Sequence, residues 1–199
     1  MTSPSIILAS GSASRRALLK NAGVDAVSIS PILDEDSVKT GLRASNVPIR
    51  DQAMKLAELK GQKVSAQNPG LVIAGDQMLA LGERAFDKPK DKDEARGHLE
   101  ALGGQTHTLE TAIVICDGGV PVWRHLARPK LTMRPLSKAY IDTYLDEVGD
   151  SVLQTVGGYQ LESLGSQLFT KIEGDYFSIL GLPLLPLLDY LRTRGVLAV

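Results

Sequence analysis

The stretch LVIAGD, residues 71–76, decides the fold. Five small or apolar residues run without interruption between Pro69-Gly70 and Asp76. Such a run, without polar alternation, is typical of a strand buried on both faces of an α/β sheet. Met78 to Leu81 extends it. We therefore expect a central strand here, with a carboxylate where the uninterrupted run ends.

Strand and helix patterns alternate on both sides of this central strand. We expect strands over residues 6–9, 26–30, 106–115, 120–133 (broken or bulged at Pro129) and 167–172, and helices over 15–22, 48–64, 91–102, 183–194 and from Ser137 onwards. Asp117-Gly118 is a hairpin signal. Because some strands are joined by hairpins and others by helices, the sequence predicts an α/β or α+β fold with a mixed, twisted sheet.

Length and composition limit the classes of function. The 199 residues suffice for one domain or two small lobes. A net charge of -1 gives no general attraction to nucleic acid or to anionic membranes. The single cysteine, Cys116, excludes an intrachain disulfide and fits a reducing compartment. Without a basic start at the N-terminus or a run of about 18 apolar residues, we expect neither a secretory signal nor a membrane span, and therefore the cytoplasm.

A small polar loop, Ser10 to Arg16, follows the first expected strand and leads into a helix. Unpaired N–H groups and the helix dipole favour an anion at such a point. Ser10 and Ser12 can donate hydroxyl groups, and Arg15 can bind two phosphate oxygens at once. The spacing is not that of a P-loop. An ordinary serine-capped helix explains the same residues.

Two groups of acidic residues could hold a metal ion. Asp34-Glu35-Asp36 follow an apolar stretch, and Asp76 follows the central apolar run. Carboxylate oxygens suit Mg²⁺ or Mn²⁺, and strand ends are where open α/β sheets bind ligands. Asp76 could ligate the metal or act as a general base. A solvated turn and a strand-ending aspartate are the alternatives.

Two lysines could contact a polyphosphate. Lys60 shares a helix face with Ala53, and Lys88 precedes Pro89, which favours an extended backbone. A lysine at the edge of an apolar face and a surface loop residue are the alternatives. The three histidines have no zinc-ligand spacing with Cys116.

Taken together, eight segments resemble the Maf family, also called septum-formation-inhibitor-like proteins, in their order and spacing. They are LASGSASRRALLKNAGV (residues 8–24), Asp34-Glu35, LAELK (56–60), VIAGDQ (72–77), Lys88-Pro89, LGGQTHTLET (102–111), GGYQLESLG (157–165) and IEGDYFSILGLPL (172–184).

The resemblance implies a single Maf-like domain over residues 1–199, elongated, with two lobes around a cleft as in inosine triphosphate pyrophosphatases. It implies an Mg²⁺- or Mn²⁺-dependent house-cleaning hydrolase that converts nucleoside triphosphates to monophosphate and pyrophosphate. It also implies a cytoplasmic homodimer, and the net charge of -1 predicts neither nucleic acid nor membrane as partner. Carried over by position, Ser10 and Arg15 hold phosphates, Lys60 and Lys88 contact the triphosphate, and Glu35 and Asp76 serve metal and water, with Asp76 as proton acceptor.

Three positions bear on the base. The family branch that prefers 7-methyl-GTP has Gln, Glu and Trp where this chain has Gln77, Glu162 and Ser14. Two of the three match, and a carboxylate at Glu162 can accept from the N–H edge of guanine. Ser14 cannot stack on a cationic base as Trp can. Asp87 also replaces the usual Gly before Lys-Pro.

Two other functions remain open from the sequence. One is a pyrophosphatase for dTTP and UTP, the preference of the other family branch. The other is a nucleotide-binding regulator of cell division with little turnover. The paired carboxylates Glu35 and Asp76 favour hydrolysis, because nucleotide binding alone does not need both.

Overall fold

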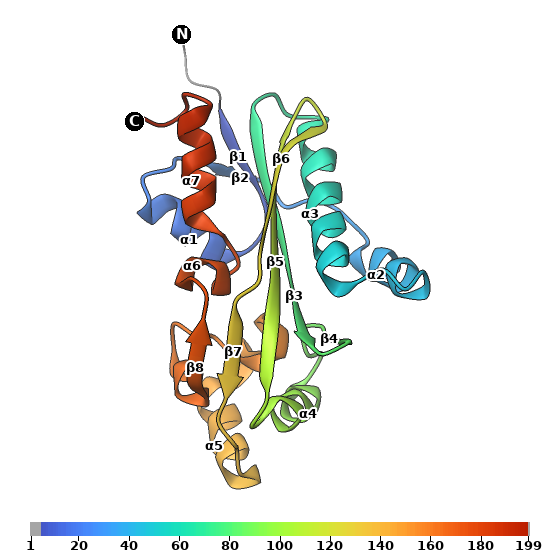
Figure 1. Cartoon of the computed structure of the whole chain (residues 1–199), viewed down its shortest axis with the longest axis vertical. Helices are drawn as coiled ribbons and strands as arrows, with labels where there is room; N and C mark the ends of the chain where they lie inside the picture. The colour runs from blue at the N-terminus through green and yellow to red at the C-terminus, as the bar shows by residue number, and fades with distance from the viewer. Residues whose placement is uncertain (1–4, 199) are drawn as a thin grey trace. The chain divides into compact units, whose positions relative to one another are not determined.

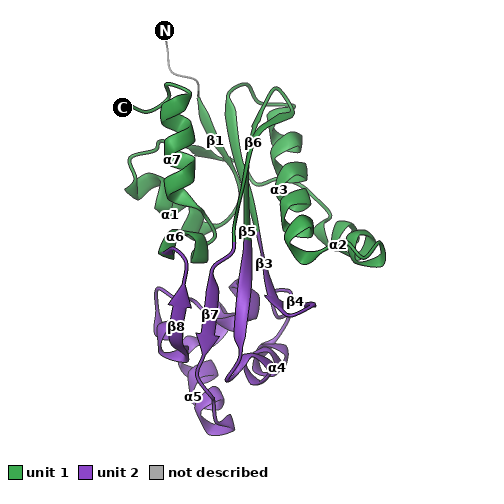
Figure 2. Cartoon of the chain, in the orientation of Figure 1, with its two compact units in different colours: residues 1–76, 111–127, 176–199 green, residues 77–110, 128–175 purple. Residues whose placement is uncertain are grey.

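The computed structural model describes residues 5–198. The ends of the predicted 1–199 domain therefore lie outside the described residues, as do the first residues of the N-terminal stretch, where we expect no secretory signal. The chain divides into two compact units (Figure 2). Unit 1 comprises the chain up to Asp76, residues 111–127 and residues from 176 onwards, whereas unit 2 comprises residues 77–110 and 128–175. Each unit is therefore assembled from separate stretches of sequence.

The strands of residues 5–198 form one eight-stranded mixed sheet in the order β2-β1-β3-β5-β7-β8, with β4 paired to β3 and β6 to β5 (Figure 1). Their bounds are β1 Ile6–Ala9, β2 Val27–Ser28, β3 Leu71–Leu81, β4 Arg84–Phe86, β5 Thr106–Asp117, β6 Val120–Ala127, β7 Lys130–Met133 and β8 Phe169–Glu173. β1 is parallel to β2 and β3, while β5 is antiparallel to β6 and β7. The predicted α/β class with a mixed sheet and a central β3 is confirmed.

The helices include every one that the sequence predicts. They are α1 Ala13–Asn21, α2 Glu35–Ala44, α3 Ile49–Ser65, α4 Lys92–Leu102, α5 Lys138–Val148, α6 Tyr176–Ile179 and α7 Leu184–Thr193, with 3₁₀ turns η1 Gly149–Gln154, η2 Val156–Gly158 and η3 Leu164–Leu168. The sequence did not predict α2, α6 or the 3₁₀ turns. α2 begins inside the acidic run, where the side chain of Asp34 accepts from the N–H of Ser37. Carboxylates are favoured there because they offset the helix dipole.

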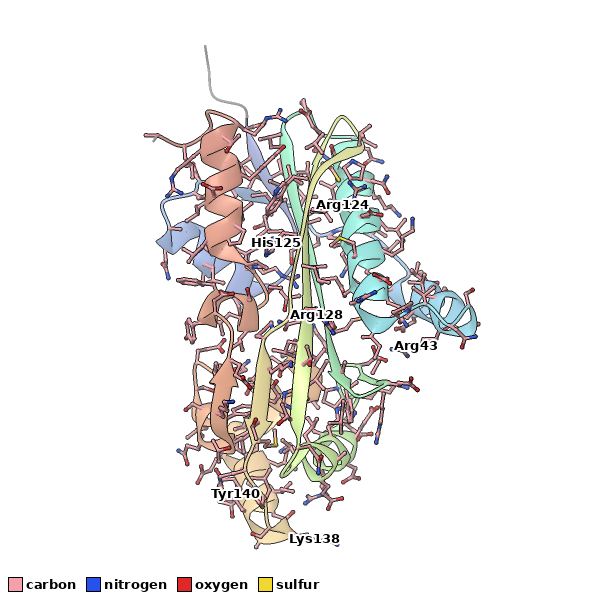
Figure 3. The ribbon with its side chains drawn as sticks, in the orientation of Figure 1. Arg43, Arg124, His125, Arg128, Lys138 and Tyr140 are labelled. Atoms are coloured by element: carbon pink, nitrogen blue, oxygen red, sulfur yellow. The ribbon has the colours of Figure 1, made fainter. Side chains whose placement is uncertain are left out.

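Unit 1 buries both faces of its part of the sheet, with α1 and α7 on one face and α3 on the other (Figure 1). α3 lies very close to the strands at Gly61, where a Cβ atom would stand 2.7 Å from Sγ of Cys116. Arg124 on β6 also donates to Glu58 of α3 at 2.5 Å (Figure 3). These contacts fix α3 against the sheet. Lys60 lies on α3 between the two contacting residues, Glu58 and Gly61, so its position is fixed with them.

Unit 2 has its own core, in which α4, α5 and the 3₁₀ turns pack around buried leucines and Tyr159. Nε2 of His107 on β5 lies 2.7 Å from the Tyr159 hydroxyl. Nδ1 of His107 is buried and has no hydrogen-bond partner among the described residues. Burial lowers the pKa of His107 from 6.5 to about 4. The neutral imidazole is therefore the form that the folded state favours.

The first testable prediction concerns this histidine. Because its pKa is lower in the folded than in the unfolded state, its contribution to stability is complete above pH 6.5 and is lost as the pH falls towards about 4. A difference of about 2.5 pKa units corresponds to about 3 kcal/mol of unfolding free energy. Urea titrations at pH 7 and pH 4.5 should show a smaller loss in His107→Gln, whose amide can still meet Tyr159 but does not titrate. An equal loss in both proteins would contradict the prediction.

Candidate active site

Unit 1 gathers five of the predicted site residues, each from a different element or its edge. They are Ser10, Arg15, Glu35, Lys60 and Asp76. The parallel pairing of β1 with β3 places Ala9 opposite Ala74, so Ser10 and Asp76 both lie just beyond this pair, at the carboxyl end of β1. Ligands of α/β sheets bind at such edges. Glu35 and Asp76 thus lie beside Lys60 in one compact unit, while the roles predicted for these residues stay predictions.

Lys60 stands at the centre of this group. Its Nζ lies 2.7 Å from Oδ1 of Asp76 and 2.9 Å from Oε1 of Glu35. Lys60 is 8% and Asp76 6% exposed, whereas the Glu35 side chain is 39% exposed. A buried charge requires a partner, and here each buried group is the partner of the other. The snorkelling alternative for Lys60 is therefore wrong, because its ammonium points into the cluster.

The ionisation of Asp76 follows from its surroundings. Burial raises the pKa of this carboxyl, Lys60 and Arg15 oppose that rise, and the nearby charge of Glu35 adds to it. A carboxylate with a raised pKa is a better proton acceptor than an exposed one. Burial therefore favours the protonated form of Asp76, and its contact with Lys60 favours the charged form.

Arg15 is held by the backbone. Its Nε donates to the carbonyl of Gly181 at 2.7 Å, and its Nη1 donates to Oγ of Ser10 at 3.2 Å. Cβ atoms added at Gly75 and Gly181 would lie 3.3 Å and 3.4 Å from Nε, so these two glycines leave a slot for the guanidinium. Burial lowers the pKa of Arg15 and the carboxylates of Asp76 and Glu35 raise it, and a guanidinium stays charged throughout.

The roles of Gly75 and Gly181 were missed from the sequence. Neither residue carries a functional group in its side chain, and the signal that was present, the segment of residues 172–184, came only from the family resemblance. The slot depends on the left-handed backbone of Gly181, whose φ is +94°, and on its closeness to α1, which is far away in the sequence.

The loop Ser10 to Arg16 has features of both interpretations of its sequence, the anion site and the serine-capped helix. Oγ of Ser12 accepts from the N–H of Arg15 at 3.3 Å, which makes Ser12 the N-cap of α1. Oγ of Ser10 accepts from the N–H of Ser12 at 3.2 Å as well as from Arg15. Ser14 is partly buried in the first turn of the helix. The loop is thus an ordinary capped helix start that also brings a serine hydroxyl and a guanidinium together.

The other predicted site residues belong to unit 2. Gln77 follows Asp76 on β3 and is partly buried, and Lys88 is exposed between β4 and α4. Glu162 is exposed in a turn between η2 and η3. That turn is tightly closed, because the N–H of Ser163 donates to the Gln160 carbonyl and a Cβ at Gly165 would overlap the Gln160 backbone. Glu162 is therefore displayed on a rigid loop.

The unit 1 cluster fits a divalent cation. Glu35 and Asp76 already hold a cation between them, the ammonium of Lys60, which stands in for a metal ion. Within residues 5–198 no three His, Cys, Asp or Glu side chains form a ready metal site. Two carboxylates alone suit Mg²⁺ or Mn²⁺ rather than Zn²⁺, since these ions keep several waters and bind substrate phosphates as further ligands.

The chain is similar to known proteins over most of its length. The family pattern described as Maf-like protein matches residues 5–194. A nucleoside triphosphate pyrophosphatase of Hyphomonas neptunium is 65% identical over 96% of this chain and 97% of its own length. One from Caulobacter vibrioides is 52% identical over 98% of both chains. A 7-methyl-GTP pyrophosphatase of Rhizobium meliloti is 47% identical, again over 98% of both chains.

Proposed function

Because this chain belongs to the Maf-like protein family, we propose that it hydrolyses the α–β phosphoanhydride of nucleoside triphosphates, releasing a monophosphate and pyrophosphate. The observation that carries the proposal is the grouping of the buried pair Lys60 and Asp76 with the partly exposed Glu35 and with Arg15, beyond the carboxyl end of β1. The names of its relatives in Hyphomonas and Rhizobium support the same reaction class.

The chemistry follows from charge. A triphosphate carries about four negative charges, so a water molecule can attack it only where cationic groups offset that charge. Arg15 and Lys60 supply two of them, and Ser10 supplies a hydroxyl beside Arg15. Asp76 accepts the proton of the attacking water, as its burial allows. We also propose that Lys88 contacts the triphosphate and helps to neutralise the leaving pyrophosphate.

We propose that Glu35 and Asp76 hold Mg²⁺ or Mn²⁺. Such an ion, when bound, neutralises phosphate charge and polarises the phosphorus that is attacked. Of the two carboxylates, Glu35 is the more exposed and therefore the one freer to serve the metal alone. Asp76 is then left the more available for the water.

Product analysis tests the proposed reaction. The protein is incubated with Mg²⁺ and, separately, 7-methyl-GTP, UTP, dTTP and ITP, and the phosphate products are separated. We expect pyrophosphate and the monophosphate in equal amounts. Orthophosphate would overturn the bond assignment. Tight binding of nucleotide with no product at any metal concentration would favour the division regulator.

We propose 7-methyl-GTP or a similarly modified purine as the preferred substrate, because Gln77 and Glu162 match that branch of the family. Glu162 is offered on a rigid turn, where a carboxylate can accept from the N–H groups of guanine. dTTP and UTP remain the alternative, because Ser14 has no ring that could stack on a cationic base.

Glu162→Gln tests the base assignment. The amide presents both a donor and an acceptor, so kcat/KM for 7-methyl-GTP should fall by about tenfold to 100-fold, in line with about 1.5–3 kcal/mol for a charged hydrogen bond. Activity on UTP and dTTP should hold or rise. Glu173→Gln, an exposed glutamate of β8 in the same unit, is the matched control. An unchanged ranking of the four nucleotides would defeat the assignment.

We further propose that residues 1–199 act as one domain in a cytoplasmic homodimer with neither nucleic acid nor membrane as partner. The family pattern runs through both compact units, which supports one functional domain. Among residues 5–198 no helix is long and apolar enough to cross a membrane. Light scattering should give about twice the chain mass of 21.3 kDa.

A further inference from the structure

We infer that the ammonium of Lys60 competes with the metal ion for the carboxylates of Glu35 and Asp76 until a polyphosphate binds the ammonium instead. The protein with metal bound then binds nucleotide more tightly than the free protein does, and the protein with nucleotide bound likewise binds metal more tightly. This inference rests on the proposed function, because it concerns the same carboxylates. It adds that the affinities for metal and substrate depend on each other, and that Lys60 controls the affinity of the carboxylates for the metal.

The first step is the position of the ammonium. Nζ of Lys60 is within 3 Å of one oxygen of each carboxylate, and its side chain is only 10% exposed. A metal ion held by Glu35 and Asp76 would use oxygens of the same two groups. Two cations cannot share them closely, because like charges at ligand distances repel strongly in a weakly screened site. Metal binding must therefore displace the ammonium, fully or in part.

The second step is where the ammonium can go. The backbone of Lys60 is held in place, because a Cβ atom at the next residue, Gly61, would stand 2.7 Å from Sγ of Cys116, so the ammonium moves only by rotation of its own side chain. Within the cluster, Arg15 and Lys60 balance Glu35 and Asp76 in charge. A divalent ion would leave an excess of two positive charges in a buried place. An anion with several negative charges removes that excess and offers oxygens to the displaced ammonium.

The third step is the linkage between the ligands. If the metal frees Lys60 for the polyphosphate, the polyphosphate must strengthen the metal by the same factor. The free protein then binds metal weakly, and the assembled site forms only with both ligands. A lysine that contacted phosphate but lay away from the carboxylates would leave the affinity for metal alone nearly unchanged when it is removed.

The test measures Mn²⁺ binding, not turnover. Free Mn²⁺ is counted by electron paramagnetic resonance at about pH 8, where exposed carboxylates are fully ionised, for wild type, Lys60→Met and Lys63→Met. Lys63 is an exposed lysine one turn along α3 and is the matched control. We expect Lys60→Met to bind Mn²⁺ at least about tenfold more tightly than wild type, since one tenfold step is the removal of about 1.4 kcal/mol of competition. Lys63→Met should match wild type.

A second experiment adds inorganic tripolyphosphate. Because tripolyphosphate itself chelates Mn²⁺, its affinity for Mn²⁺ is measured in solutions without protein and subtracted. Tripolyphosphate should tighten Mn²⁺ binding severalfold in wild type and much less in Lys60→Met. Equal or weaker Mn²⁺ binding by a folded Lys60→Met, as judged by circular dichroism, would overturn the inference, and so would absence of Mn²⁺ binding to both proteins. Neither experiment requires catalysis. A failure to release pyrophosphate would therefore overturn the proposed reaction without deciding whether Lys60 competes with the metal.

Discussion

Asp76→Asn is expected to lower kcat by at least about 10³-fold while the protein stays folded. The change removes the proton acceptor, whose loss alone costs about 10²–10⁴, and it removes one carboxylate from the proposed metal pair. The amide is nearly the same size and can still accept from Nζ of Lys60, which now lies 2.7 Å from Asp76 Oδ1. Pyrophosphate release under saturating nucleotide and metal is the measurement.

Asp117→Asn is the matched control for this change. Asp117 is the last residue of β5 in unit 1, but its side chain is about half exposed and it pairs only loosely with Arg194, at 3.5 Å. Its activity should stay within about twofold of wild type, as for surface substitutions in general. Wild-type rates in a folded Asp76→Asn protein would remove this carboxylate from the mechanism.

The sequence was sufficient for β3, because a continuous apolar run of this length after Pro-Gly has few other structures. Asp76 does not end the strand as its sequence suggested, since β3 continues through it to Leu81. It was also sufficient for the helical period of α3. Local spacing could not give the partner of Lys60, however, since a lysine on an apolar face is equally compatible with snorkelling to water. Only the close approach of α3 to the sheet at Gly61 decides between the two.

Glu35 shows a second limit of sequence reasoning. Three adjacent acids resemble a solvated turn, and the structure instead begins a helix there, with Asp34 as cap and Glu35 in the first turn. The carboxylate of Asp34 accepts from the helix backbone, whereas the carboxylate of Glu35 pairs with Lys60. The 3₁₀ turns before Glu162 were missed for a related reason. They have no periodic apolar pattern and depend on glycines with positive φ, such as Gly157.

Arg15→Met is expected to lower kcat/KM for the preferred nucleoside triphosphate by about 10²–10³, the usual cost of one charged group that stabilises the transition state. Methionine fills similar space but has no charge and cannot donate to Gly181 or Ser10. Arg15→Lys should recover only part of the loss, because an ammonium cannot occupy the flat slot between Gly75 and Gly181 or bind phosphate oxygens in a fork. Steady-state kinetics with competitive inhibition by tripolyphosphate measures both effects.

The neighbouring Arg16 provides the control for this experiment, since it is exposed on the same turn of α1. Arg16→Met removes the same charge from the same helix and should leave kcat/KM within about twofold of wild type. The Gly181 carbonyl loses its donor in Arg15→Met, at a cost of about 1–3 kcal/mol, so thermal melts must show that the assay temperature lies below unfolding. Equal losses in the two methionine variants would mean that general charge, rather than a guanidinium held in the glycine slot, attracts the nucleotide.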